Sequence, residues 1–249
     1  MSNALIIIPT YCEKESIEKL VRNIFSLKTD FDILVIDDNS PDNTSEIVEK
    51  LIREMPGKIY LLERPSKLGL GTAYITGFNW ALQNHYEFIF EMDADFSHNP
   101  NDLEPLLETI QKDGVGMAVG SRYKKGVSIV HWPMGRLLLS FYASMYVRIA
   151  TGMCVRDATA GFVCYKREVL EKLNLDKIHM KGYGFQIEMK FKTWKLGYEI
   201  EEVPVIFINR ELGDSKMSGG IFSEAFMGVI RMKLSSLRAN YKEHISQGS

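Results

Sequence analysis

Two kinds of hydrophobic pattern alternate along the chain. Short runs of consecutive apolar residues predict buried strands at 4–8, 33–36, 59–63, 86–92 and 115–120. Longer segments, with apolar residues every three or four positions, predict helices at 15–27, 44–55, 72–84 and 102–112. Continuous apolar strands separated by amphipathic helices are typical of parallel sheets with both faces covered. We therefore predict an α/β fold with a mostly parallel sheet and helices on both faces.

Acidic residues follow two of these strands. Asp93 and Asp95 come directly after 86–92, and the pair Asp37 and Asp38 comes directly after 33–36. Alternation along an extended backbone puts Asp93 and Asp95 on one side, where they would form half of a Mg²⁺ or Mn²⁺ site completed by water and substrate phosphates. They could instead be ordinary turn residues. The second pair favours a ligand site, because ligands of open α/β sheets bind outside the carboxyl ends of the strands.

Composition narrows the functional classes. The 249 residues are 45% hydrophobic and 25% charged, which is typical of a globular protein. A net charge of −2 gives no electrostatic case for nucleic acid as a partner. Three scattered cysteines without CxxC spacing argue against a zinc site or a disulfide framework and fit a reducing compartment. The first residues contain no basic region of a signal peptide, so none is expected.

The glycines at Gly69 and Gly71 do not form a dinucleotide-binding fingerprint. That fingerprint belongs in the first strand-to-helix turn, and here this turn, 9–13, contains no glycine. Gly69 precedes a predicted helix, whose N-terminus could hold an anion. The loop is therefore interpreted either as a contact to substrate or as a plain tight turn.

Three segments resemble the opening signatures of glycosyltransferase family 2. They are Ile7–Tyr11 with Glu13, Val35–Ser40 and Met92–Pro100. Later segments resemble the polyprenol-phosphate (dolichol-phosphate) mannosyltransferases within that family: Gly120–Tyr123, Trp132–Pro133 with Arg136, Asp157–Phe162, Gly182–Glu188, and Arg210 with Ser215–Lys216. The resemblance runs in order from about residue 4 to residue 216, and the ordered set is more specific than any single motif.

This resemblance implies a fold and a reaction. The fold would be that of the nucleotide-diphospho-sugar transferases (GT-A type), with a mostly parallel mixed sheet and helices on both faces. The reaction would be an inverting, metal-dependent transfer of a hexose to a polyprenyl phosphate, with mannose from GDP-mannose as the favoured donor. Three alternatives stay open: UDP-glucose or another donor, a saccharide or protein hydroxyl as acceptor, and a non-catalytic module that binds nucleotide sugars.

The resemblance also implies roles for individual residues. Catalysis is assigned to Asp93, Asp95 and Arg122, and the metal to Asp93, Asp95 and Ser97. Nucleotide-sugar binding is assigned to Pro9, Tyr11, Glu13, Asp37, Asp38, Gly69, Asp93, Arg210 and Lys216. The acceptor phosphate is assigned to Arg122, Arg136 and Ser140. Family members often carry glutamine at the position of Ser97, and a hydroxyl ligates more weakly, so the choice between Mg²⁺ and Mn²⁺ stays open.

Apart from the family resemblance, the chemistry of a phosphate acceptor also favours a site with arginine or lysine side chains. A phosphate monoester is already anionic at neutral pH, so its attack needs no general base, whereas a hydroxyl acceptor normally does. It needs cationic side chains instead, and arginine offers a planar fork suited to phosphate. The alternative for each arginine or lysine is a solvated surface charge.

The segment 132–155 predicts contact with lipid. It is rich in Leu, Met and Tyr but is interrupted by Arg136 and Arg148, which fits an interfacial amphipathic helix better than a spanning one. A buried core helix is the alternative. We expect a catalytic domain at 1–216, followed by an amphipathic helix and polar tail at 217–249. The protein would be peripheral on the cytoplasmic face of the membrane, with or without a membrane-protein anchor.

Overall fold

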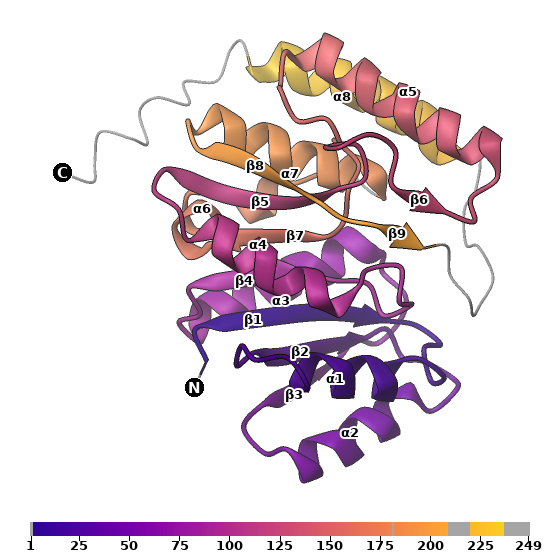
Figure 1. The fold of residues 1–249 in the computed structure, drawn as a ribbon, viewed down its shortest axis with the longest axis vertical. Helices are drawn as coiled ribbons and strands as arrows, with labels where there is room; N and C mark the ends of the chain where they lie inside the picture. Colours follow the sequence, from indigo (N-terminus) through magenta and orange to yellow (C-terminus); the bar gives the residue numbers. More distant parts are fainter. Residues whose placement is uncertain (1, 181, 209–219, 237–249) are drawn as a thin grey trace.

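The structure, a computed structural model, describes residues 2–180, 182–208 and 220–236 (Figure 1). These residues form one seven-stranded sheet in the order β3-β2-β1-β4-β7-β5-β8 and a two-stranded sheet of β6 and β9. The strands are β1 (Ala4–Thr10), β2 (Asp32–Asp37), β3 (Ile59–Glu63), β4 (Phe88–Glu91), β5 (Val115–Ser121), β6 (Ile129–Val130), β7 (Val163–Lys166), β8 (Glu199–Pro204) and β9 (Phe207–Ile208).

The first four strands are parallel, and their register brings the acidic segments together. Ile7 of β1 lies opposite Leu34 of β2 on one side and Glu91 of β4 on the other. The carboxyl ends of the three strands therefore meet at one edge of the sheet. Strand β7 runs antiparallel to both of its neighbours, β4 and β5.

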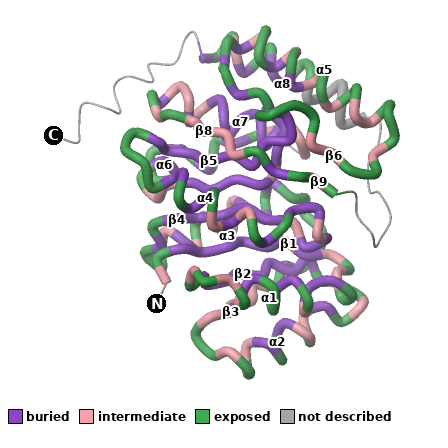
Figure 2. The backbone as a smooth tube through the Cα atoms, in the orientation of Figure 1, coloured by how far each residue is buried: buried purple, intermediate pink, exposed green. Residues whose placement is uncertain are grey.

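Helices cover both faces of this sheet. Helices α1 (Ile17–Phe25), α2 (Thr44–Glu54) and α4 (Leu103–Ile110) pack on one face, over alternate residues of β1 such as Ile6. Helices α3 (Leu70–Gln83), α6 (Arg167–Lys172) and α7 (Tyr183–Lys195) pack on the other face, over residues such as Leu5 and Ile7. Short 3₁₀ turns occur at Pro100–Asp102 and Leu175–Lys177. Figure 2 shows the buried sheet between its partly exposed helices.

Two further helices form an outer layer. Helices α5 (Met134–Thr151) and α8 (Gly220–Ser236) lie side by side and pack on α7 through a small core that includes Val147, Phe191 and Val229 (Figure 1). The opposite side of α5 is open to solvent. Met134 is 68% exposed and Ile149 is 77% exposed. The alternative of a buried core helix at 132–155 is therefore wrong.

The predicted alternation of strands and helices and the two covered faces are confirmed. The predicted strand 86–92 is β4, shorter at both ends, and the predicted helix 15–27 is α1. The predicted mixed sheet is confirmed by the antiparallel strand β7, although no strand was predicted at 163–166. The boundary proposed at residue 216 lies outside the described residues.

Candidate active site

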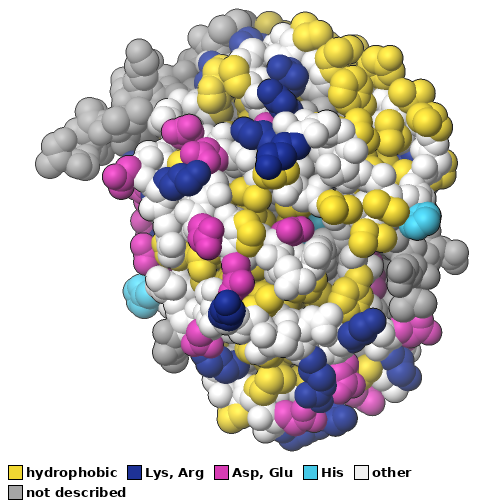
Figure 3. Space-filling model, viewed as in Figure 1, with side chains coloured by type: hydrophobic (Ala, Val, Ile, Leu, Met, Phe, Trp, Pro, Cys, Tyr) yellow, Lys and Arg dark blue, Asp and Glu magenta, His cyan; other side chains and the backbone are white. Residues whose placement is uncertain are grey.

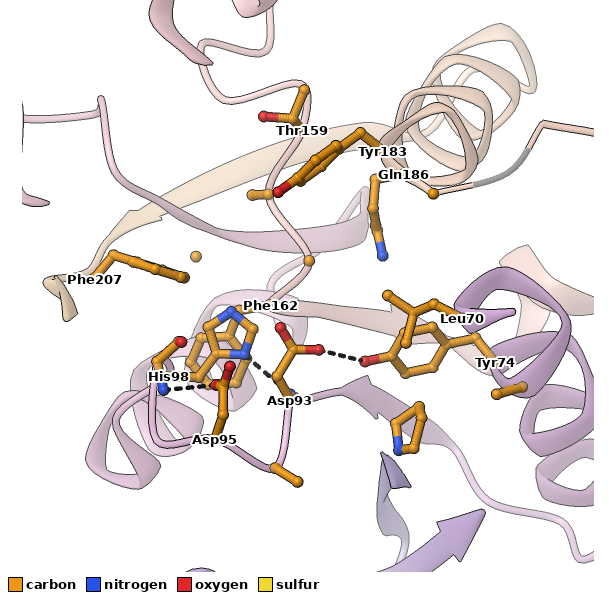
Figure 4. A pocket seen from close by; sticks show the side chains of 18 of the residues that line it. Leu70, Tyr74, Asp93, Asp95, His98, Thr159, Phe162, Tyr183, Gln186 and Phe207 are labelled. Carbon is orange, nitrogen blue, oxygen red and sulfur yellow. Dashed lines mark hydrogen bonds between the residues drawn. The ribbon is translucent and has the colours of Figure 1, made fainter. Parts of the chain in front are cut away.

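A pocket of about 470 Å³ opens at the carboxyl ends of β1, β2 and β4. Its walls come from the sheet edge, the start of α3, the start of α7 and the segments around β6 and β9 (Figure 4). Many of the predicted site residues line it: Pro9, Tyr11, Glu13, Asp38, Gly69, Asp93, Asp95, Ser97, Arg122 and Arg136. The resemblance therefore selected residues from distant parts of the chain that the fold brings together.

The floor of the pocket is the acidic turn after β4. Asp93 and Asp95 both project from this turn into the pocket (Figure 4). The backbone N–H of Ser97 donates to Asp95 Oδ1 at 3.0 Å, which tightens the turn. The Tyr74 hydroxyl of α3 donates to Asp93 Oδ1 at 3.5 Å. The turn that carries both carboxylates is thus held by hydrogen bonds along its own backbone and to the neighbouring helix.

His98 supports this turn. Its Nδ1 accepts a hydrogen bond from the backbone N–H of Asp93 at 3.1 Å, and its ring stacks on Phe162 with centroids 4.8 Å apart. Burial lowers the pKa of His98 to about 4, so the ring is neutral near pH 7 and its Nδ1 can accept. The hydrogen bond to His98 therefore orients the backbone of Asp93.

The end of the pocket nearest β1 and β2 combines aromatic, acidic and basic side chains. Asp38 accepts a hydrogen bond from Arg64 Nε at 2.6 Å, and the same guanidinium donates to Thr72 Oγ1 of α3 at 2.8 Å. The Lys67 ammonium lies 4.4 Å from the centre of the Tyr11 ring. Sequence reasoning missed Arg64 and Lys67, although both lie in the segment directly before Gly69.

Gly71 has a packing role that its sequence pattern did not reveal. A Cβ at this position would lie 2.9 Å from the Phe185 ring of α7, so the glycine permits close approach of α3 and α7. Gly69 itself lines the pocket and has φ of +102°, a conformation that favours glycine. The loop therefore serves both as a tight turn and as part of the pocket wall.

The opposite end of the pocket carries the arginines. Arg122 lines the pocket, but its guanidinium forms two hydrogen bonds with Asp157, from Nε at 2.7 Å and from Nη2 at 2.6 Å. Both partners of this ion pair are buried. The Arg136 guanidinium stacks over Trp132 at 4.1 Å from the ring centre. The charge of Arg122 is thus balanced within the protein, and Arg136 approaches the pocket along an aromatic side chain.

Some predicted residues lie apart from this pocket. Asp37 is fully buried, and its carboxylate accepts hydrogen bonds from Thr10 Oγ1 at 2.8 Å and from the hydroxyl and backbone N–H of Ser40. Ser140 accepts a hydrogen bond from the Tyr123 hydroxyl at 2.9 Å. Neither Asp37 nor Ser140 is among the residues that line the pocket. Arg210 and Lys216 lie outside the described residues.

Comparison with known families agrees with this arrangement. Residues 5–174 match the family described as "Glycosyl transferase family 2". The chain belongs to glycosyl transferase family 2. It is a glycosyltransferase, and the acidic turn, the Asp38 segment and β1 from Leu5 onwards lie within the matched region.

Two curated relatives span most of this family 2 chain. The undecaprenyl-phosphate mannosyltransferase of Micrococcus luteus is 44% identical over 232 residues, which is 93% of this chain and 94% of that protein. The polyprenol monophosphomannose synthase of Mycolicibacterium smegmatis is 43% identical over 225 residues, which is 90% of this chain and 84% of that protein.

Solved structures show the same fold. Glucosyl-3-phosphoglycerate synthase of Mycobacterium tuberculosis, in complex with Mn²⁺, UDP and glucosyl-3-phosphoglycerate, superposes with a TM-score of 0.63. The identity is 19%, and the match covers 94% of this chain and 79% of that one. The predicted GT-A type fold of this glycosyltransferase is therefore confirmed.

The donor set of this glycosyltransferase fits a hard divalent cation. Among the described residues, no three His, Cys, Asp or Glu side chains gather into a complete metal cluster. Asp93 and Asp95 instead supply two carboxylates at the floor of the open pocket. Mg²⁺ commonly binds through one or two carboxylates together with substrate phosphates. The residues present would suit such a half-site, with Ser97 beside it.

A buried polar chain behind the pocket wall was missed by sequence reasoning. Glu91 of β4 and Lys190 of α7 are both fully buried, and Gln186 of α7 lies between them. Burial raises the pKa of Glu91 to about 7 and lowers the pKa of Lys190 to about 8. In the sequence, Glu91 and Lys190 look like ordinary polar residues of a strand and a helix. Only the fold shows that both form hydrogen bonds with Gln186.

Proposed function

We propose that this family 2 glycosyltransferase transfers mannose from GDP-mannose to a polyprenyl phosphate, with inversion at the transferred carbon. The observation that carries the proposal is the layout of one pocket. Its acidic floor at Asp93 and Asp95 suits a metal-bound diphosphate, and its far end carries Arg136 close to the exposed apolar side of α5. The two curated relatives support this proposal, because one is named as an undecaprenyl-phosphate mannosyltransferase and the other as a polyprenol monophosphomannose synthase.

The proposed roles follow from this geometry. Asp93 and Asp95 would hold Mg²⁺ or Mn²⁺, which when bound offsets the negative charge that builds on the leaving diphosphate. Tyr11 and Asp38 would bind the nucleoside at the other end of the donor. Arg136 would orient the acceptor phosphate towards the sugar. Because that phosphate is already anionic, no side chain has to remove a proton from it.

A donor-by-acceptor assay tests the proposal. Purified protein with Mg²⁺ or Mn²⁺ is given labelled GDP-mannose, UDP-glucose or UDP-N-acetylglucosamine, with and without a short polyprenyl phosphate. We expect label to move into the organic phase only with GDP-mannose and the lipid. Transfer from a uridine donor would overturn the choice of donor, and transfer only to a saccharide or protein hydroxyl would overturn the choice of acceptor.

Arg136→Ala should weaken the use of the acceptor. Losing one charge-assisted contact to phosphate is expected to raise the acceptor KM by about 10- to 100-fold, while the donor KM changes by less than about twofold. Steady-state kinetics in detergent, with each substrate varied in turn, measures this. Arg53→Ala, which removes an exposed arginine of α2 that neither lines the pocket nor lies on α5 or α8, is the control. An unchanged acceptor KM would remove Arg136 from the phosphate site.

The outer helices suggest how the enzyme reaches a lipid acceptor. Within the described residues, no helix is both long enough and apolar enough to cross a bilayer. Exposed apolar side chains nevertheless gather on α5 and α8, including Leu138, Ile149 and Leu234 (Figure 3). Exposed arginine residues, Arg148 on α5 and Arg231 on α8, interrupt this surface. An apolar stripe with basic residues is typical of a helix that lies in the membrane interface, so we propose that this surface rests on the cytoplasmic face of the membrane.

The double variant Leu138→Glu/Ile149→Glu should bind vesicles less. Burying each apolar side chain in the interface contributes about 1.5–3 kcal/mol, so the partition coefficient should fall at least about tenfold. Co-sedimentation with phosphatidylglycerol/phosphatidylcholine vesicles measures the bound fraction. Leu68→Glu, which changes an exposed leucine in the loop between β3 and α3, away from α5 and α8, is the control. Equal binding by all three proteins would contradict the proposed surface.

A further inference from the structure

A buried chain of hydrogen bonds ties the wall of the pocket to its floor. Gln186 Nε2 donates to Glu91 Oε2, and Glu91 Oε1 accepts a hydrogen bond from the Tyr165 hydroxyl at 3.0 Å. On the other side, Lys190 Nζ donates to Gln186 Oε1 at 3.4 Å and to the Ala160 carbonyl at 2.6 Å. Glu91, Gln186 and Lys190 are all at most 3% exposed. The chain joins α7, β4, β7 and the loop before β7.

These partners fix the orientation of the Gln186 amide. The Lys190 ammonium can only donate and so requires the amide oxygen on its side, which leaves the amide nitrogen facing Glu91; a flipped amide would set its nitrogen against the ammonium. An amide nitrogen carries two hydrogens, of which Glu91 takes one. Figure 4 shows the Gln186 nitrogen pointing into the pocket, towards the side that carries Asp93. Gly161, beside this nitrogen, has no side chain to cover it.

The start of α7 is held to the acidic floor by a second contact. The Phe185 ring stacks on the Tyr74 ring, with centroids 6.1 Å apart, and the Tyr74 hydroxyl donates to Asp93. Gly71 permits this approach. Two neighbouring residues of α7, Phe185 and Gln186, are therefore connected to the strand and turn that carry Asp93.

The position of Gln186 along the sheet indicates what it would meet. Tyr11 and Asp38 follow β1 and β2 at one end of the pocket, and Arg122 follows β5 towards the other end. Gln186 is bonded to β4, which lies between them in the strand order. In a transfer reaction, the sugar has to lie between the nucleoside and the acceptor. Gln186 therefore faces the part of the pocket where the transferred sugar would lie.

We propose that the Gln186 amide nitrogen donates a hydrogen bond to a hydroxyl of the transferred sugar, and that Glu91 and Lys190 position that amide. The inference rests on the proposed function in one respect, that the ligand is a nucleotide sugar. Gln186 is a substrate-binding residue in this proposal, and Glu91 and Lys190 act through it as positioning residues.

Exchanging the two side chains separates binding from packing. Glu91→Gln leaves the Lys190 cation without its buried anion, and Gln186→Glu adds a second buried anion, so each single variant should lose stability. The double variant Glu91→Gln/Gln186→Glu keeps one carboxylate, one amide and the hydrogen bond between them. It should recover most of the lost thermal stability. It still places a carboxylate, which can only accept, where the amide nitrogen donated, so the sugar hydroxyl would have to reverse the direction of the bond and sugar recognition should not fully recover.

The readout is the ratio of the Kd for GDP to the Kd for GDP-mannose, measured by calorimetry with Mn²⁺ and without acceptor. The nucleoside diphosphate is an internal control, because it has no sugar for Gln186 to contact. We expect the double variant to lose about 5- to 50-fold in this ratio, as is usual for a lost hydrogen bond to a buried polar group. Gln83→Glu, the same substitution at an exposed position of α3, should leave the ratio unchanged.

The outcomes separate this inference from the proposed function. A double variant that recovers both thermal stability and the wild-type ratio would overturn the contact between Gln186 and the sugar. If the wild-type protein prefers UDP-glucose, the same ratio is measured with UDP and UDP-glucose. In that case only the proposal that GDP-mannose is the donor is wrong. If it binds a nucleotide sugar but transfers nothing to polyprenyl phosphate, the proposed acceptor is wrong and the ratio still decides the role of Gln186. A wild-type protein that binds none of these donors would contradict both proposals.

Discussion

Asp95→Asn is expected to lower kcat/KM for sugar transfer by at least about a thousandfold at any concentration of Mg²⁺ or Mn²⁺ near physiological levels. The asparagine oxygen can still accept the hydrogen bond from the Ser97 backbone, so the turn should keep its shape. The substitution removes one of the two charges that would hold the metal against the donor diphosphate. Transfer of labelled sugar into the organic phase, titrated with each metal, measures the effect.

A metal-binding measurement makes this result specific. The electron paramagnetic resonance signal of free Mn²⁺, recorded with GDP present, should show weaker binding by the Asp95 variant than by the wild type. Asp113→Asn, which changes an exposed aspartate in the turn before β5, should affect neither binding nor transfer. Normal metal-dependent turnover by the Asp95 variant would show that the acidic turn does not hold the metal.

Asp157→Asn should cost about 3–5 kcal/mol in the free energy of unfolding, because it leaves the buried Arg122 cation without its partner. Two side-chain hydrogen bonds and a bond from the Arg122 backbone N–H at 2.9 Å converge on this carboxylate. The loss should appear as a lower denaturant midpoint at an unchanged slope. The variant should also lose activity, because Arg122 and Thr159 both line the pocket.

An exposed ion pair provides the comparison. Lys112 and Glu201 lie 2.8 Å apart at the surface, and Glu201→Gln should change the unfolding free energy by less than about 1 kcal/mol. If Asp157→Asn also changed the unfolding free energy by less than about 1 kcal/mol, Arg122 would have to donate its hydrogen bonds to water or to another acceptor within the folded protein. Its assignment as a buried structural cation would then be wrong.

The parts of the site that follow from local pattern could be predicted from the sequence. Apolar runs that end in acidic residues placed Asp38, Asp93 and Asp95 at strand ends, and parallel register brought those ends to one edge. Family resemblance added Arg136, which the fold does bring to the same pocket. These inferences succeeded because each depends on a short segment or on an ordered set of motifs.

Pairings between distant segments could not be predicted in the same way. The partner of Asp38 is Arg64, and the partner of Arg122 is Asp157, and in neither case does sequence spacing indicate the contact. Arg64 looked like an ordinary charged residue, and Asp157 belonged to a family motif that assigned it no partner. Asp37 shows the converse, because it resembles Asp38 in the sequence but turns into the protein to bond Thr10 and Ser40.

The segment that became α5 shows a limit of periodicity. Its pattern of apolar residues with two arginines was compatible with a core helix and with an interfacial one. Only the packing against α7 and α8 showed which side is buried, and that side is narrow, with Ser144, Val147 and Thr151 at its centre. Amphipathicity indicates that a helix has an apolar side, but it does not indicate what covers that side.

The antiparallel strand β7 also has a consequence for synthesis of the chain on the ribosome. Strand β4 ends at Glu91, but the neighbour that completes it on one side begins only at Val163. Until that segment has emerged, β4 is the edge of a partial sheet, and the unpaired backbone groups beside Ile89 and Phe90 could pair with another nascent chain. The strand that positions the acidic turn thus keeps one unpaired edge while the segments from α4 to α5 are being made, and prompt delivery of β7 or a chaperone would shield that edge.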